Sequence, residues 1–125
     1  MSDDRYVVLV CGGRKFTDAD TVDRWLSMLR TRPTLVVHGG AGGADTLAHM
    51  WAKLNGVEAR PYPADWTKLG PRAGPVRNQQ MLDAEKPDLV LAFEGGRGTA
   101  DMVRRARAAG VPVIEASTAA TPEGK

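Results

Sequence analysis

The 125-residue chain is poor in cysteine, histidine and aromatic residues, and it has no long apolar run. The single cysteine, Cys11, excludes an internal disulfide and any cluster built from several cysteines. Two histidines far apart in the sequence, with scattered acids, predict no metal site. Aromatic residues make up only 6% of the chain, so few side chains can stack on the bases of a single-stranded nucleic acid.

The apolar runs Val7–Cys11 and Leu89–Phe93 are far too short to span a bilayer. The chain starts Met-Ser-Asp-Asp, without the basic and apolar segments of a secretory signal. We therefore expect a cytoplasmic protein with no membrane association. No motif for a cofactor or a metal is present, so neither is predicted.

The charge of the chain is nearly balanced, with 17 basic and 15 acidic residues and a net charge of +2. Because the arginines are spread along the chain, this charge permits an anionic ligand without indicating a nucleic-acid surface. The hydrophobic fraction of 42% is that of an ordinary globular protein. We expect residues 1–125 to form one domain, with a core over 6–116 and a tail over 117–125.

The chain is organised around the stretch Asp88–Met102. Its run Leu89–Phe93 is typical of a strand buried on both faces of a parallel sheet. Three glycines follow directly, and Thr99 then opens a segment with helical spacing. A strand that turns through glycines into a helix leaves N–H groups free, and the helix dipole adds positive charge there. Such a turn favours an anion, most often a phosphate, although it also occurs as a simple tight turn.

Two earlier strands end in glycines in the same way. Tyr6–Cys11 is followed by Gly12 and Gly13, and Leu35–Val37 leads through His38 into a glycine-rich run. Strands alternate with helices, which predicts an α/β fold: a single Rossmann-like domain with an open parallel sheet and helices on both faces. We expect the strand order 3-2-1-4-5, which brings the three glycine turns to one crevice above the carboxyl ends of the strands.

Two apolar stripes predict helices that pack on this sheet, at Val22, Trp25, Leu26 and Leu29 and at Leu47, Met50, Trp51 and Leu54. Thr17 or Asp18 would cap the first helix. The charged run Val57–Tyr62 predicts an edge strand. The remaining expected elements are a long irregular loop, two helices and a fifth strand, at Pro63–Pro75, Val76–Ala84, Thr99–Ala109 and Val113–Ile114.

The glycine turns lack the usual nucleotide signatures. The turn after the first strand has no G-x-G-x-x-G motif. The turn at Gly95 has no lysine before Thr99, which excludes a P-loop. Arg77, at a predicted helix start beside the crevice, is either a phosphate clamp or a surface arginine. Asn78 either bonds a sugar hydroxyl or supports the helix start. Asp45 either caps its helix or binds a ribose hydroxyl.

Three further residues are candidates for contact with a ligand. On the long loop, Trp66 offers an indole that stacks on a base, and Asp65 offers a carboxylate. Glu94 ends the central strand and is either an acid/base group or a solvated carboxylate. His38 is expected to be a hydrogen-bonded strand-end residue, and His49 to lie on the exposed side of its helix.

The predicted ligand-binding residues are the glycine turns and the polar residues beside them: Gly12, Gly13, Arg14, Gly39, Gly40, Gly42, Gly43, Asp45, Asp65, Trp66, Arg77, Asn78, Gly95, Gly96, Gly98 and Thr99. The candidates for a catalytic role are Arg77, Glu94 and Asp65.

Five segments occur in an order known from one bacterial and phage family of unknown function: Gly12–Phe16, His38–Asp45, Pro63–Trp66, Ala73–Asn78 and Glu94–Thr99. From about Val7 to Ile114 the chain resembles the YspA-type, YpsA-related branch of the SLOG superfamily, the relatives of Smf/DprA and LOG. The resemblance implies a Rossmann-like fold, a nucleotide or nucleotide-derived ligand, and a homodimer. LOG proteins release cytokinin bases from nucleoside 5′-monophosphates, and DprA binds single-stranded DNA.

The LOG motifs are present with two departures. Arg77 with Met81 matches R-x-x-x-M, and the glycines before Thr99 match P-G-G-x-G-T-x-x-E. Glu94 replaces the proline, and Met102 stands in place of the catalytic glutamate. A thioether cannot transfer a proton, so Asp101, Glu94 or Asp65 would have to substitute.

Three functional hypotheses follow from these residues. The first is a module that binds a nucleotide-derived ligand, as a sensor, because the three turns converge and the glutamate is missing. The second is a LOG-like phosphoribohydrolase that cleaves the N-glycosidic bond of a nucleoside 5′-monophosphate. The third is DprA-like binding of single-stranded DNA, which the few aromatic residues favour least.

Overall fold

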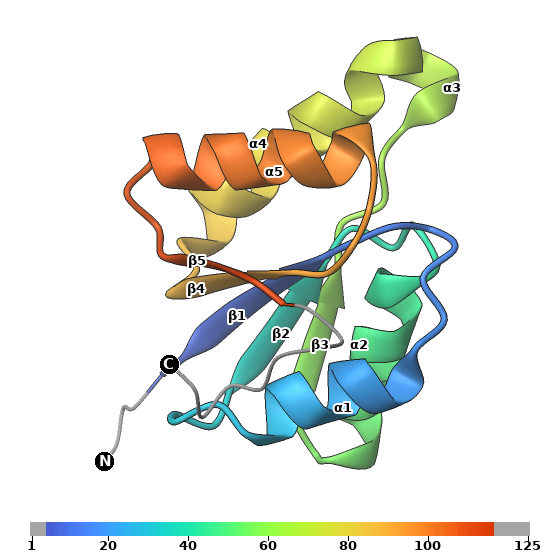
Figure 1. Ribbon diagram of the computed structural model, residues 1–125. Coiled ribbons are helices and arrows are strands. Elements are labelled where there is room, and N and C mark those ends of the chain that lie inside the picture. The colour runs from blue at the N-terminus through green and yellow to red at the C-terminus, as the bar shows by residue number, and fades with distance from the viewer. Residues whose placement is uncertain (1–4, 117–125) are drawn as a thin grey trace.

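The computed structural model describes residues 5–116, which form a five-stranded parallel sheet with helices on both faces (Figure 1). The strands are β1 Val7–Cys11, β2 Leu35–His38, β3 Glu58–Pro61, β4 Leu89–Ala92 and β5 Val113–Glu115. The helices are α1 Ala19–Ser27, α2 Ala44–Leu54, α3 Trp66–Leu69, α4 Ala73–Glu85 and α5 Arg97–Ala108, with a 3-10 turn at Gly70–Arg72. The expected tail over 117–125 lies outside the described residues.

The strand order is β3-β2-β1-β4-β5, which confirms the predicted fold class and topology. β1 lies in the centre and pairs in parallel with both β2 and β4. These three strands are buried along their whole length because helices cover both faces. β3 is half-exposed at the sheet edge, as its charged residues predicted, and Pro61 ends it.

The helices form two layers. α1 and α2 cover one face of the sheet, and α4 and α5 cover the other (Figure 1). Successive strand residues therefore supply two separate cores. Val8, Val10 and Leu91 pack with Trp25 of α1, on one side. On the other side, alternate strand residues pack against α4 and α5, among them Leu9, Val90, Met81 and Met102.

The segment 63–75 is largely helical, so the predicted long loop is wrong. Asp65 Oδ1 accepts a hydrogen bond from the Lys68 N–H at 3.1 Å and caps α3. The 3-10 turn follows, and α4 begins at Ala73. Pro71 and Pro75 do not prevent this, because each lies in a first helical turn, where the backbone N–H has no partner within the helix.

The predicted apolar stripe of α2 is also wrong in part. Met50 and Leu54 are 53% and 83% exposed. The buried face of α2 instead carries small residues at helical spacing, including Ala44, Ala48 and Ala52. Small side chains let the helix lie close to the sheet, which turns the larger residues outward. Several element bounds differ as well; for example, α5 begins two residues before the predicted Thr99, and α1 ends before Leu29.

The two histidines contact each other, so His49 does not lie on an exposed helix face as expected. His38 Nδ1 accepts a hydrogen bond from the Gly40 N–H at 3.0 Å. The other ring nitrogen of His38 therefore carries the proton and donates to His49 Nδ1 at 2.9 Å. Burial, with His49 and Arg77 nearby, lowers the pKa of His38 to about 4. His38 is thus neutral and holds the start of the loop after β2.

We expect this buried histidine to make the protein less stable in mild acid. In the unfolded chain His38 titrates near pH 6.5, whereas in the folded chain its pKa is about 4. Between these values the unfolded state binds the additional proton, so the free energy of unfolding should fall by about 2 kcal/mol from pH 7 to pH 5. Urea unfolding at both pH values measures the loss. His38→Gln should flatten the dependence, and equal stability at both pH values in the wild type would contradict it.

Candidate functional site

The three glycine turns meet at one cleft of about 1010 Å³, above the carboxyl ends of β1, β2 and β4. The N-terminal part of α4 and the segment around Trp66 complete its walls. This position is the switch point of the sheet, where the chain leaves β1 toward β2 on one side and where β4 lies on the other. The convergence expected from the sequence is therefore observed.

The turn after β1 is held between the other two turns by backbone contacts. The Gly13 N–H donates to Glu94 O at 2.9 Å, and Gly13 O accepts from the Ala44 N–H at 3.2 Å. A Cβ on Gly12 would lie 2.6 Å from Ala44 Cβ, and one on Gly95 would lie 2.6 Å from the Gly13 nitrogen. Glycine is required at both positions because the turns touch each other.

The loop after β2 is closed by side chains. Asp45 Oδ2 accepts hydrogen bonds from the Gly39 and Ala41 N–H groups, both at 3.1 Å. Gly43 adopts φ +57° and packs against the turn after β1, where a Cβ would overlap Gly13 O. This loop therefore offers the cleft few free donors.

The third turn is open. Gly96 caps α5 without any side-chain hydrogen bond. The N–H groups of Arg97, Gly98 and Thr99 donate to no other residue in the described part of the chain, and all three residues line the cleft. Three free donors at a helix N-terminus, with the positive end of the dipole behind them, form a site suited to an anion.

Cationic side chains line the same cleft as this helix terminus. Arg14 and Lys15 from the turn after β1, and Arg97 and Arg104 from α5, all line the cleft. The Arg14 guanidinium lies 5.5 Å from the centre of the Trp66 ring, which is a cation–π contact. The cleft thus combines positive charge with an indole that remains 47% exposed.

Arg77 lies in the cleft, but protein groups already bind most of its guanidinium. Nη1 donates to Gly39 O at 2.6 Å and to Tyr62 O at 3.2 Å, and Nε donates to Asn78 Oδ1 at 3.0 Å. Burial lowers its pKa from the ordinary value. Only Nη2 has no hydrogen bond among residues 5–116, so a bidentate clamp on phosphate requires Arg77 to release one of these partners.

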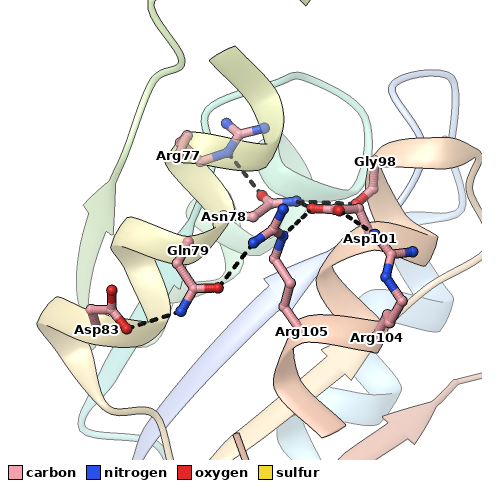
Figure 2. A network of polar contacts seen from close by, with 8 residues as sticks. All are labelled: Arg77, Asn78, Gln79, Asp83, Gly98, Asp101, Arg104 and Arg105. Carbon is pink, nitrogen blue, oxygen red and sulfur yellow. Dashed lines mark hydrogen bonds and ion pairs between the residues drawn. The ribbon is translucent and has the colours of Figure 1, made fainter. Parts of the chain in front are cut away.

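Asn78 and Asp101 link α4 to the first turns of α5 (Figure 2). Asn78 Nδ2 donates to Gly98 O at 3.2 Å and to Asp101 Oδ2 at 3.0 Å. Arg104 and Arg105 donate to the two oxygens of Asp101 at 2.6 and 2.8 Å. Burial raises the pKa of Asp101, but the bonds from Arg105 and Asn78 outweigh it and leave the pKa below its ordinary value. The Asp101 carboxylate therefore stays charged and fixes the helix that carries the free N–H groups.

Comparisons with known proteins agree with this architecture. Residues 6–69 match the family described as "YspA, cpYpsA-related SLOG family". The chain is also 42% identical over 117 residues to the "Gene 61 protein" of Mycobacterium phage D29, a match that covers 86% of this chain and 93% of the phage protein. The chain belongs to the YspA, cpYpsA-related SLOG family. The resemblance noted in the sequence is thereby confirmed.

The fold of this SLOG chain is similar to that of DNA processing protein A (DprA) from Streptococcus pneumoniae. The TM-score is 0.50 at 19% sequence identity, and the match covers 90% of this chain. It covers 59% of the DprA chain, so the SLOG domain described here spans about three fifths of that structure.

Most of the predicted ligand-binding residues of the SLOG chain line the cleft; the exceptions are Gly40, Gly42, Gly43 and Asp65. Asp65 is exposed and serves as the cap of α3. Glu94 lines the mouth of the cleft and is exposed. Met102, in the position of the LOG glutamate, is fully buried in the core between the sheet, α4 and α5.

Sequence reasoning missed several cleft residues, among them Phe16, Arg97 and Arg104. A signal for two of them was present, because Arg97, Asp101 and Arg104 recur at i, i+4 and i+7 and thus share one face of α5. Among residues 5–116, no three His, Cys, Asp or Glu side chains come close enough to hold a metal ion. In the same range no helix has the length and apolar character needed to span a membrane.

The two kinds of glycine should respond oppositely to alanine. Gly12→Ala places a methyl group against Ala44 and should destabilise the fold by about 1–3 kcal/mol. Gly98→Ala meets no atom within 4 Å and lies in a helix, so it should be neutral or stabilise by up to about 1 kcal/mol. Urea unfolding of both variants measures the difference. A Gly12→Ala variant as stable as the wild type would show that the turns do not touch.

Proposed function

We propose that this SLOG protein binds a nucleotide or nucleotide-derived small molecule, with a phosphate group at the N-terminus of α5. The observation that carries the proposal is the set of free N–H groups at Arg97, Gly98 and Thr99, which open into a cleft lined by cations. An anion there would accept several hydrogen bonds and interact with the helix dipole. The loop after β2 competes little for it, because Asp45 accepts hydrogen bonds from the Gly39 and Ala41 N–H groups and the Ala44 N–H donates to Gly13 O.

The rest of the cleft suits a flat organic group. Phe16, Trp66, Pro71 and Pro75 give its walls an apolar character. The Arg14 guanidinium lies over the Trp66 ring, and about half of the Trp66 surface remains exposed. A base that stacks on Trp66 would extend this contact.

The second candidate function is cleavage of the N-glycosidic bond of a nucleoside 5′-monophosphate. It is supported by the carboxylates that line the cleft, Asp45, Glu94 and Asp101. It is weakened by the burial of Met102 in the core, which keeps that position away from any substrate. Chromatography of nucleoside monophosphates after long incubation with the protein separates the two functions. Release of free base with ribose 5-phosphate would make the protein a hydrolase, and unchanged nucleotide would favour a sensor.

Binding of single-stranded DNA ranks third, since the cleft offers few aromatic side chains for a run of stacked bases. Oligonucleotide binding with a steep dependence on salt would support it instead. The homodimer and the cytoplasmic location expected from the sequence stay predictions.

The backbone donors of α5 can be tested separately from its cation. Arg97 is the first residue of α5, where proline is well tolerated, so Arg97→Pro removes one N–H and the guanidinium without breaking the helix. Arg97→Ala removes only the guanidinium and is the matched control. By calorimetry with nucleoside monophosphates, Arg97→Pro should bind roughly 10-fold more weakly than Arg97→Ala, because it loses a charge-assisted hydrogen bond. Equal affinities would place the phosphate elsewhere.

The stacking role of Trp66 can be read from fluorescence. Trp25 and Trp51 are buried, so a change of emission on binding should come from Trp66. Trp66→Ala should remove this change in emission and weaken the binding of nucleotides by about 1–3 kcal/mol, while the affinity for ribose 5-phosphate stays nearly the same. Equal losses for both ligands would refute stacking on a base.

A further inference from the structure

Asp45 has one carboxylate oxygen without a partner. Asp45 is 5% exposed, and its Oδ2 accepts hydrogen bonds from the N–H groups of Gly39 and Ala41. Its Oδ1 is buried and has no hydrogen-bond partner in the described part of the chain. Buried carboxylate oxygens are rarely left unpaired, because the lost hydration is costly. Asp45 also lines the cleft, so a bound molecule is the natural source of the missing donor.

The position of this carboxylate is fixed from two sides. Asp45 accepts a hydrogen bond from the Gly39 N–H. Arg77 Nη1 donates to the carbonyl oxygen of Gly39 at 2.6 Å. A side chain on Gly39 would overlap the Arg77 guanidinium, so the three groups pack directly together. The unpaired oxygen is therefore part of a built element of the cleft rather than of a loose surface chain.

We propose that Asp45 Oδ1 accepts a hydrogen bond from a sugar hydroxyl of the ligand, so that the cleft selects ribose over deoxyribose derivatives. This inference rests on the proposed binding function and names the class of ligand for the same site. Oδ1 is buried while its residue lines the cleft, and the last torsion of an aspartate side chain has a broad energy profile. A rotation of the carboxylate about this torsion would let Oδ1 accept from a hydroxyl in the cleft.

A hydroxyl fits this place better than a cation does. Arg77 is close enough to Asp45 to act on its charge, so a ligand ammonium group would meet a guanidinium beside the carboxylate. Cys11 is also near, and burial raises the pKa of its thiol to about 12, which keeps it neutral. A metal ion lacks further ligands, since residues 5–116 bring no three His, Cys, Asp or Glu together. A neutral donor pairs Oδ1 without adding charge.

The test compares sugars in the wild-type protein. The probes are the four ribonucleoside 5′-monophosphates with their 2′-deoxy and 3′-deoxy counterparts, titrated by calorimetry. A hydroxyl bonded to a carboxylate is expected to give the ribonucleotides an advantage of roughly 10- to 100-fold in affinity over at least one deoxy series. The deoxy series that loses affinity identifies the hydroxyl.

Asp45→Asn then assigns the effect to this side chain. The amide oxygen can keep the bonds from Gly39 and Ala41, and the amide nitrogen replaces the charged acceptor. The preference for ribose should fall to less than about 3-fold. The control Asp83→Asn removes an exposed carboxylate of α4 that does not line the cleft, and it should keep the full preference.

The outcomes separate this inference from the function on which it rests. Binding of ribo- and deoxyribonucleotides with equal affinity overturns the inference and leaves the proposed function intact. A preference for ribonucleotides that survives in Asp45→Asn also overturns the inference, because another group then binds the sugar hydroxyl. If no nucleotide of the panel binds, both the function and the inference are wrong. The wild-type comparison decides the ribose preference even if Asp45→Asn fails to fold.

Discussion

The site depends on one backbone contact, the insertion of Gly13 between two other turns. Its N–H donates to Glu94 O after β4, and its oxygen accepts from the Ala44 N–H at the start of α2. Without side chains at Gly12 and Gly95 the three turns can approach to backbone contact. The carboxyl ends of β1, β2 and β4 are thus joined by main-chain hydrogen bonds, which form the floor of the cleft.

The three turns contribute to the cleft in different ways. The turn after β1 joins the other two through Gly13, and the loop after β2 is closed by Asp45, so these two turns shape the cleft. The third keeps three N–H groups free, and the network of Asn78 and Asp101 holds its helix against α4 (Figure 2). An anion site of this kind needs no mobile side chain to form, since its donors are backbone groups at a fixed helix end.

Much of the fold could be predicted because its signals are local. The uninterrupted apolar strands and the glycines after them indicated a parallel sheet, and the right-handed crossover rule left few strand orders. One error fell where packing between distant segments decides, and another where a local signal has two meanings. The stripe of α2 was assigned to Met50 and Leu54 because large apolar residues usually face the core, whereas the close approach to the sheet favoured alanines. The helical segment before Ala73 was missed because prolines at first-turn positions look like loop signals.

The sequence by itself determined the strands, the glycine turns, the placement of Arg77 beside the crevice and the membership of the SLOG family. Only the tertiary structure decided which groups face the cleft and which are already bound. It placed Met102 in the core and Asp101 beside the cleft, engaged Arg77 with Gly39 and Tyr62, and left one oxygen of Asp45 unpaired. The physical reason is that local patterns fix backbone conformation, whereas the partners of a polar side chain come from segments many residues away.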